Sequence, residues 1–332
     1  MPARRLNTVR WAAPRNSAGP LAVAALLAAC GGARTSVPAS GPRPDRALTH
    51  VVVVSVDGLR PDAIDAAGAE TLQRLRREGA HAPEARTIVP SLTLPSHTSM
   101  LTGVAPEDHG VTWNDDSAAG QVDSVADTLS TVRVTTAFAE ADAAGLRTAA
   151  FFGKTKLRYL IRPGSVDRAT YPTRTYARIA AQVVGDAAPH MRDARPHFTF
   201  VHLAEPDLAG HSAGWMTRPY RYAVRRADDA VRELWHSARD AFGDGLVFIV
   251  TADHGGHGRT HGSDRPEDVR IPWIAWGRGV QPGVVAGPVT TYDTAATVLW
   301  LLGVPAPPGW DGRAVTAAFG VQTAPARTTG PR

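Results

Sequence analysis

Histidines and aspartates gather in one glycine-rich segment in the second half of the chain. Residues 251–264 read TADHGGHGRTHGSD, which places three histidines and two aspartates in fourteen positions. Imidazole and carboxylate groups are the ligands that zinc and related divalent ions take from proteins, and glycine lets the backbone pass close to such groups. The segment therefore predicts a metal site, and the next question is which residues elsewhere complete it.

Acidic residues also follow three separate apolar runs. VVVVSV ends at Asp57, HFTFVHL leads into AEPD and Asp207, and LVFIVTA ends at Asp253. Because the carboxyl ends of parallel strands meet at one edge of a sheet, these side chains are expected to lie together. The candidate metal ligands are Asp57, Asp207, His211, Asp253, His254, His257 and His261. The other histidines are expected to be surface residues or hydrogen-bonded core residues; they are His50, His81, His97, His109, His190, His197, His202 and His236.

Two local patterns indicate how these residues would share ions. Asp207 and His211 lie four positions apart, and Gly210 between them would let the backbone bend until both side chains reach one ion. Asp253 and His254 are neighbours at a strand end, where consecutive side chains point to opposite sides, so they would serve two ions of a pair. A single acid at a strand end is more often a helix cap or a turn former. The convergence of several on one edge favours a metal centre.

A nucleophile is predicted in residues 89–103, VPSLTLPSHTSMLTG. Pro95 is suited to the first turn of a helix. A hydroxyl just before that helix would face its exposed backbone N–H groups, which favour an anion such as phosphate. Thr93 is the best candidate, while simple capping of the helix by Thr93 or Ser91 is the structural alternative.

The elements that must position these residues alternate along the chain. Short apolar runs predict strands at 51–57, 147–153, 197–203, 246–253 and 272–277, and helical spacing predicts helices at 62–78, 128–144 and 220–242. Such alternation is typical of an α/β fold, here a three-layer αβα sandwich with a mainly parallel central sheet.

The amino-terminal segment reads as an export signal. A segment with arginines at positions 4, 5, 10 and 15 and no acid precedes the apolar run LAVAALLAA, which is too short to span a bilayer. The only cysteine, Cys30, follows at once, and the pattern resembles a bacterial lipoprotein signal in which this cysteine is acylated. A plain secretory peptide is the alternative. We expect an exported protein that is lipid-anchored at the bacterial cell envelope, in the periplasm or on the outer surface.

This interpretation also divides the chain and explains its charge. Residues 1–29 are expected to be the signal peptide, 30–47 a flexible tether, 48–320 the catalytic domain and 321–332 a disordered tail. The formal net charge is +5, but without the four leader arginines 32 basic residues face 31 acidic ones, or +1. We therefore expect no partner that is a nucleic-acid duplex.

Six motifs together resemble the alkaline phosphatase superfamily. VDGLRPD, PSLTLPSHTSMLTG, PEDHGV, EPDLAGH, TADHG and THG occur in that family's order, between about Val51 and Asp311. The branch they resemble most is the nucleotide pyrophosphatase/phosphodiesterase-like (type I phosphodiesterase) branch. Such a resemblance implies two zinc ions, or other divalent ions, and a threonine or serine nucleophile.

The resemblance also implies a role for each matching residue. One ion would be held by Asp57, Thr93, Asp253 and His254, and the other by Asp207, His211 and His261. Asn114, in GVTWND, would hydrogen-bond a non-bridging phosphoryl oxygen. His257 and His261 compete for the last ligand position, since many relatives carry a long insertion there and this chain does not. The local match of THG favours His261, with His257 and Asp264 as loop residues.

Two lysines in GKTKLR, residues 153–158, follow the predicted strand RTAAFFG. Lys154 and Lys156 would project the same way if the chain stays extended. Relatives that cleave phosphomonoesters or phosphonoacetate place a similar pair here, so the lysines indicate a substrate with extra negative charge. A solvated basic loop is the alternative, but lysine is scarce in this chain, which favours a functional role.

The resulting hypothesis is a phosphoric-ester hydrolase that acts through a phosphothreonine intermediate. Small phosphomonoesters, phosphodiesters and nucleotides all fit, with a preference for monoesters. Alternatives are a phosphonate hydrolase and a lipid-anchored binding protein with a vestigial metal site. A sulfatase would need a cysteine or serine at the nucleophile position, where this chain has Thr93. A phosphoglycerate-mutase-type enzyme would normally have serine and manganese.

Overall fold

The computed structural model describes residues 49–114, 134–162, 164–173 and 179–320. The predicted leader, the acylated Cys30, the tether and the carboxyl-terminal tail lie outside these residues. The domain boundaries and the lipid anchor therefore stay predictions.

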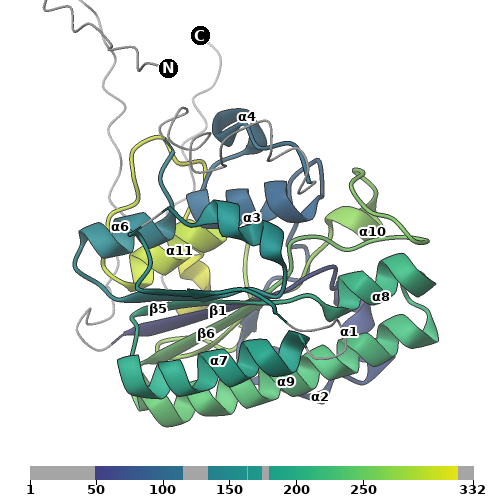
Figure 1. Ribbon diagram of the computed structural model, residues 1–332, viewed down its shortest axis with the longest axis horizontal. Helices are drawn as coiled ribbons and strands as arrows, with labels where there is room; N and C mark the ends of the chain where they lie inside the picture. The colour runs from purple at the N-terminus through teal and green to yellow at the C-terminus, as the bar shows by residue number, and fades with distance from the viewer. Residues whose placement is uncertain (1–48, 115–133, 163, 174–178, 321–332) are drawn as a thin grey trace, which may run out of the picture. The chain divides into compact units, whose positions relative to one another are not determined.

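A single mixed sheet forms the middle layer of the described part (Figure 1). Its strand order is β4-β3-β5-β1-β6-β7-β2-β8, and the strands from β4 to β6 pair in parallel, whereas β7 runs antiparallel to both β6 and β2. The strands are β1 (His50–Val56), β2 (Ala80–His81), β3 (Thr148–Phe151), β4 (Arg168–Thr170), β5 (Phe198–Leu203), β6 (Leu246–Thr251), β7 (Trp273–Gly277) and β8 (Gly283–Val284). The mainly parallel sheet expected from the sequence is confirmed.

The central strand β1 fixes the edge at which the functional groups meet. Its valine run is buried on both faces, as is typical of a strand covered by helices on each side. Ser55 pairs with His202 on β5 and with Thr251 on β6. Because these three strands are parallel and in register, the residues that follow each of them emerge at the same edge.

Helices cover both faces of the sheet and complete the three-layer αβα sandwich (Figure 1). One layer is organised by the long helix α9, which contacts α1, α2, α7 and α8; the other contains α3, α6 and α11, which contact one another. The helix bounds are α1 (Pro61–Ala67), α2 (Glu70–Glu78), α3 (Thr93–Thr102), α4 (Pro106–His109), α6 (Ala137–Ala143), α7 (Ile179–Ala194), α8 (Glu205–Ala213), α9 (Arg218–Phe242), α10 (Pro266–Val269) and α11 (Asp293–Leu301). Within the described ranges, none of these helices is both long and apolar enough to cross a bilayer.

The structure corrects two of the predicted helices. The helix expected over residues 62–78 is two helices, because Gly68 adopts the left-handed conformation with φ of 66° and ends α1. The helix expected over 220–242 begins earlier, at Arg218, where the Thr217 side chain accepts a hydrogen bond from the Tyr220 N–H. Of the helix expected over 128–144, the described residues contain α6.

Candidate active site

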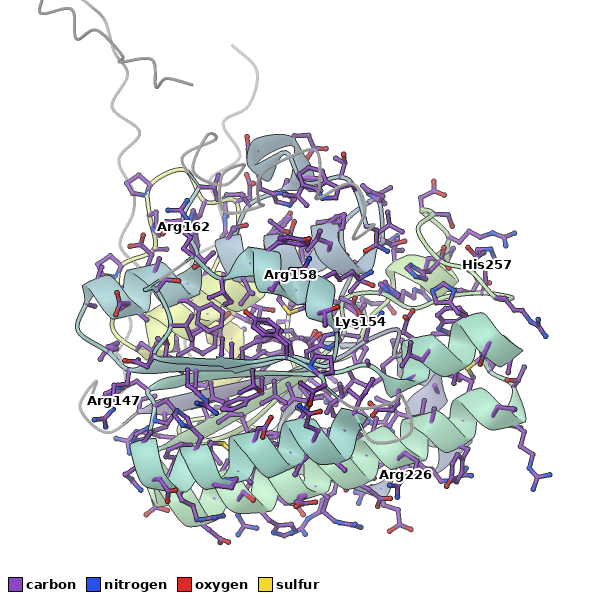
Figure 2. All side chains as sticks on the ribbon, viewed as in Figure 1. Arg147, Lys154, Arg158, Arg162, Arg226 and His257 are labelled. Atoms are coloured by element: carbon purple, nitrogen blue, oxygen red, sulfur yellow. The ribbon has the colours of Figure 1, made fainter. Side chains whose placement is uncertain are left out.

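Acidic and imidazole side chains from three strand ends converge at the carboxyl edge of the sheet. Asp57 follows β1, Asp253 and His254 follow β6, and Asp207 lies in the first turn of α8, directly after β5. All four are buried, with at most 2% of each residue exposed. Lys154 Nζ contacts two of them, Asp57 and Asp207. Figure 2 shows Lys154 between the sheet and α3, and His257 in the loop beside α10. The convergence expected from the strand ends is therefore present.

One set of potential ligand atoms comes from Asp57, Asp253 and His254, which we call the inner group. Its ligand atoms all lie within 4.8 Å of one another. The His254 Nε2 atom is 3.4 Å from Asp57 Oδ1 and 3.4 Å from Asp253 Oδ2. The expectation that Asp253 and His254 point to opposite sides is wrong, because β6 ends at Thr251 and the next residues no longer follow strand geometry.

A second set, the outer group, consists of Asp207, His211 and His261. The His211 Nε2 atom is 3.3 Å from Asp207 Oδ1 and 3.1 Å from His261 Nε2, and the third side of this triangle, His261 Nε2 to Asp207 Oδ1, is 3.5 Å. His254 also reaches this set, since its ring stacks on that of His261 with centroids 3.6 Å apart. The two groups are thus adjacent.

Helix geometry brings Asp207 and His211 together, not a bend at Gly210. Both residues lie in α8, and residues four apart in a helix share one face. Gly210 is needed for a different reason: a Cβ atom there would lie 2.6 Å from the ring of Trp215. The sequence-based interpretation was therefore right about the pair and wrong about the cause.

The hydrogen bonds of the three histidines leave their Nε2 lone pairs facing the carboxylates. In each ring Nδ1 must carry the hydrogen, because its partner is a carbonyl oxygen that can only accept. The acceptors are Gly255 O for His254 at 2.8 Å, Ser91 O for His261 at 2.9 Å and Arg259 O for His211 at 3.1 Å. Imidazoles oriented in this way are typical metal ligands.

Three carboxylate oxygens complete this cluster of acceptors. Asp57 Oδ1, Asp207 Oδ1 and Asp253 Oδ2 are buried and accept no hydrogen bond from any residue that the structure describes. Buried oxygens without a donor are costly, and here they face nitrogen lone pairs that repel them. A divalent cation in each group would satisfy both sets of atoms, so the residues present fit two such ions.

Burial and neighbouring charges shift the pKa values of the residues in the cluster strongly. Burial raises the pKa of Asp57, but the ammonium of Lys154, the hydrogen bond from His202 and the charge of His254 together more than offset this, and the pKa of Asp57 falls well below its usual range. Burial and the neighbouring charge of Asp57 raise the pKa of Asp253 well above its usual range. Burial lowers the pKa of His261 to about 3, which keeps its imidazole neutral.

Thr93 begins α3 and presents its hydroxyl to both the cluster and Lys154. The Thr93 Oγ1 atom is 3.4 Å from His254 Nε2 and 3.5 Å from Lys154 Nζ. The helix begins at Thr93, two residues before Pro95, so the expectation of a hydroxyl just outside the helix needs this correction. The residue at the N-cap of α3 is Leu92, which makes no side-chain cap, so capping does not explain Thr93. Ser91 serves a different contact, since its hydroxyl donates to Ser263 O at 2.7 Å.

Asn114 is held beside Thr93 by its amide oxygen. That oxygen accepts a hydrogen bond from the Leu94 N–H at 2.9 Å and another from Lys156 Nζ at 2.9 Å. Since the oxygen takes both donors, the amide nitrogen is the end that remains for an incoming acceptor. Asn114 therefore stands where a hydrogen-bond donor to a substrate oxygen is expected.

Lys154 and Lys156, the only lysines in the chain, both reach the site but bind different groups. Lys154 Nζ lies 2.7 Å from Asp57 Oδ2 and 2.5 Å from Asp207 Oδ2, so it bridges the inner and outer groups. The chain does not stay extended after it, because residues Thr155–Leu160 form a 3-10 helix that carries Lys156 to Asn114. Burial alone would lower the pKa of Lys154, yet the two carboxylates raise it overall.

The loop after β6 separates the two histidines that compete for the last ligand position. His261 lies in the outer group, whereas His257 Nδ1 contacts Asp268 Oδ1 at 2.7 Å. Asp268 also accepts hydrogen bonds from the N–H and hydroxyl of Ser263. It is Asp268, and not the exposed Asp264, that holds this loop.

Two histidines outside the predicted ligand set contact the site directly. His202 Nε2 is 2.9 Å from Asp57 Oδ2, and His97 Nδ1 donates to the Thr93 carbonyl oxygen at 2.7 Å. The sequence left both among the surface or hydrogen-bonded core histidines and did not predict these contacts. Their positions contain a signal: His202 is one residue from the end of its strand, and His97 lies one helical turn after Thr93.

Comparison with known proteins gives one family and several relatives. The family model for type I phosphodiesterase / nucleotide pyrophosphatase matches residues 51–265. GPI ethanolamine phosphate transferase 1 of Neurospora crassa is 34% identical over 106 residues, which is 31% of this chain and 11% of that protein. The Homo sapiens protein of the same name is 33% identical over 85 residues, 25% of this chain and 9% of that protein. The chain therefore spans about a tenth of the length of these curated relatives.

Solved structures share the fold at low sequence identity. A murine ectonucleotide pyrophosphatase/phosphodiesterase 5, an inactive threonine-to-alanine variant in complex with AMP, matches with a TM-score of 0.69 and 15% identity over 83% of this chain and 100% of that one. A phosphonate monoester hydrolase from Silicibacter pomeroyi matches with a TM-score of 0.62 and 15% identity, covering 84% of this chain and 78% of that one.

Proposed function

Because the chain belongs to the type I phosphodiesterase/nucleotide pyrophosphatase family, we propose that it is a metal-dependent phosphoester hydrolase with Thr93 as its nucleophile. One observation carries this proposal: the Thr93 hydroxyl stands 3.4 Å from His254 Nε2, beside the inner and outer groups, whose three buried carboxylate oxygens have no donor among the described residues. The ligand atoms of His254 lie within 4.8 Å of those of Asp57 and Asp253 and also of those of Asp207 and His261. A hydroxyl in that position is suited to attack a phosphorus atom held between two cations.

The two ligand groups would each hold one divalent ion, which we propose to be zinc. The inner group and Thr93 would bind one zinc ion, and the outer group would bind the other. When bound, the ions supply Lewis-acid stabilisation of the attacking and leaving oxygens. The chain's own residues do the rest. The Thr93 oxygen bonds to phosphorus as the bond from phosphorus to the leaving alcohol breaks, and the hydroxyl proton passes to that alcohol. The Asn114 amide nitrogen donates to a phosphoryl oxygen, and Lys156 holds Asn114 in place. Water then hydrolyses the phosphothreonine, which releases phosphate and restores the Thr93 hydroxyl.

The test of the nucleophile is the pair Thr93→Ala and Thr93→Ser, assayed on p-nitrophenyl phosphate. Thr93→Ala should abolish turnover while the protein still takes up two ions per chain, and Thr93→Ser should keep part of the activity because it keeps the hydroxyl. A Thr93→Ala variant with normal turnover would rule out this nucleophile. Uptake of fewer than two ions by the wild-type protein would favour a vestigial binding site instead.

For the substrate, we propose a small phosphomonoester in preference to a diester. The two ammonium groups of Lys154 and Lys156 at the site support an additional negative charge on the substrate. Phosphonates of the phosphonoacetate type carry similar charge and are the alternative. The experiment compares p-nitrophenyl phosphate with bis-p-nitrophenyl phosphate, in the wild type and in a Lys154→Met, Lys156→Met variant. A diester preference that survives loss of both lysines would contradict the monoester proposal.

A second candidate is transfer of a phosphoethanolamine group. The likeness to GPI ethanolamine phosphate transferase 1 favours it, at 34% identity over 106 residues. Hydrolase and transferase would share the first step and differ in whether water or an alcohol receives the phosphoryl group. With p-nitrophenyl phosphoethanolamine, release of nitrophenol that speeds up when an alcohol is added would favour transfer.

We also propose that Cys30 is acylated and anchors the protein at the cell envelope. The apolar run that ends directly before this single cysteine supports it. Radiolabelled palmitate should be incorporated into the wild-type protein and not into Cys30→Ser. Equal labelling of both would exclude this anchor.

A further inference from the structure

We propose that His202 is a positioning residue that turns the Asp57 carboxylate so that one oxygen alone faces the inner ion. In the same way it ties the end of β3, and with it Lys154, to that carboxylate. This inference rests on the proposed metal site and concerns which residues hold its ligands in place.

His202 lies on the strand that separates β3 from β1. It is fully buried and is the penultimate residue of β5, which pairs with both neighbours. Its Nδ1 atom accepts a hydrogen bond from the Gly153 N–H at 3.2 Å. Because a backbone N–H can only donate, Nδ1 carries no hydrogen, so Nε2 carries it and donates to Asp57 Oδ2 at 2.9 Å. The ring therefore connects the ends of two strands across a third.

This hydrogen bond gives the two oxygens of Asp57 different roles: Oδ2 accepts hydrogen bonds, and Oδ1 faces the inner group. Oδ2 receives both the His202 Nε2–H at 2.9 Å and the Lys154 ammonium at 2.7 Å. Oδ1 receives no donor and lies 3.4 Å from His254 Nε2. With Oδ2 occupied by two donors, Asp57 is oriented to bind an ion through Oδ1 alone. Without His202, the Asp57 carboxylate could rotate, and Oδ1 would no longer be the only oxygen that faces the ion.

Gly153 makes this contact possible. A Cβ atom at position 153 would lie 2.9 Å from the His202 carbonyl oxygen, closer than side-chain carbons approach, and in a tight contact of 3.1 Å with His202 Nδ1. Glycine thus lets the end of β3 come within hydrogen-bond distance of the ring. Lys154 is the next residue, so the same contact fixes the start of the side chain that bridges Asp57 and Asp207.

Neighbouring side chains prevent the ring from turning. The ring of His97 meets that of His202 edge-on, with centroids 4.9 Å apart. His97 is itself fixed, since its Nδ1 donates to the Thr93 carbonyl oxygen at 2.7 Å and its Nε2 accepts from the Ser55 hydroxyl at 2.9 Å. A rigid ring is what a positioning role requires.

The experiment measures ion binding directly, without relying on turnover. Metal-free protein is titrated with Co²⁺, whose absorption spectrum reports each site, and with Zn²⁺ in competition. Two reference variants identify the ions, since Asp253→Asn removes an inner ligand and His211→Ala an outer one. The test variants are His202→Phe, which keeps a ring and loses both hydrogen bonds, and His202→Gln, which keeps an amide donor. His50→Gln is the matched control, because His50 is a strand histidine that contacts the Pro196 carbonyl oxygen away from the site.

His202→Phe should lower the affinity for the inner ion by about 10- to 100-fold, which is the usual effect of removing a hydrogen-bond partner of a metal ligand. The outer ion should keep its affinity, His202→Gln should fall in between, and His50→Gln should match the wild type. Should His202→Phe fail to fold, His202→Gln and Gly153→Ala provide the test, and both should weaken the same ion.

Equal weakening of both ions would reduce His202 to a general structural role and overturn the inference. Unchanged binding in the His202 variants, beside a weakened inner ion in Asp253→Asn, would also overturn it while leaving the proposed function intact. A wild-type protein that takes up no ion would instead overturn the proposed function and this inference together.

Discussion

The inner and outer ligand groups have the same chemistry and very different surroundings. The inner group comes from the ends of β1 and β6, and none of its side chains is exposed. The outer group comes from α8 and a loop, and 47% of the His211 side chain is exposed. Strand ends in register hold their residues rigidly, whereas a short helix and a loop allow more movement. We therefore expect the inner ion to be tightly held and the outer ion to exchange more readily.

The largest expected effect comes from removing an inner ligand. Asp253→Asn replaces a buried carboxylate that also accepts hydrogen bonds from the N–H groups of Gly58 and His254. We expect kcat/KM to fall by about 10³-fold or more, with one ion lost per chain and no recovery in excess zinc. Kinetics and metal analysis on the same sample would check this, and recovery with added zinc would show that the inner group is no more rigid than the outer one.

The contrast in burial should also appear in histidines that hold no ion. His109 is fully buried; its Nδ1 accepts from the Val111 N–H at 3.0 Å, so Nε2 donates to the Ser99 hydroxyl at 3.0 Å. Burial lowers the pKa of His109 to about 4. Between pH 6.5 and 4 the unfolded chain binds a proton that the folded protein does not, so stability rises with pH across this window.

The difference between the folded and unfolded pKa of His109 predicts that the free energy of unfolding falls by about 3 kcal/mol from pH 7 to pH 4. Urea unfolding of metal-free wild type and His109→Gln should show a smaller pH dependence in the variant. His236→Gln, which changes an exposed histidine of α9, should keep the wild-type dependence. Identical pH profiles for wild type and His109→Gln would contradict the buried, neutral state.

Removing an outer ligand should have a smaller and recoverable effect. His211→Ala leaves Asp207 and His261 in place, and its exposed position lets water replace the imidazole. We expect the outer ion to bind about tenfold more weakly, or 1.4 kcal/mol, and activity to return as zinc is raised. Loss of activity that no zinc concentration restores would remove the distinction between the two groups.

The smallest effect is expected at the histidine beside the outer group. His257 contacts Asp268 and none of the proposed ligands. His257→Gln should cost about 1 kcal/mol of stability and leave the number of bound ions unchanged. Metal analysis of His257→Gln and His261→Ala side by side separates the two, since His261→Ala alone should lose outer-ion affinity. The reverse result would make His257 the ligand.

The sequence was sufficient to predict the central strands and the edge at which the ligands meet. The valine run of β1 has one interpretation, a strand buried on both faces, and an acid directly after such a strand has a defined place in a parallel sheet. Asp57, Asp207 and Asp253 could therefore be grouped from the sequence alone. The sequence was sufficient for residues whose position follows from strand register.

Residues that depend on tertiary contacts could not be placed in the same way. The apolar spacing around Asp207 and His211 is too weak to indicate α8, since glycine and proline lie within it. The 3-10 helix that carries Lys156 to Asn114 begins soon after β3, and Gly153 between them is too weak a signal to predict it. The contact of His202 with Asp57 depends on the order of three strands, which local patterns do not encode.

The distribution of lysine has a practical consequence for handling the protein. Apart from the amino-terminal group, the chain's primary amines belong to Lys154 and Lys156, and the other basic residues are arginines. Apart from the amino-terminal group, reagents that acylate amines would therefore find only the candidate site, and there Lys156 should react before Lys154, whose amine Asp57 and Asp207 hold as an ammonium. Biotinylation or surface coupling through side-chain amines would therefore be directed at the residues that surround Thr93 and Asn114, and we expect it to impair whatever chemistry they carry out.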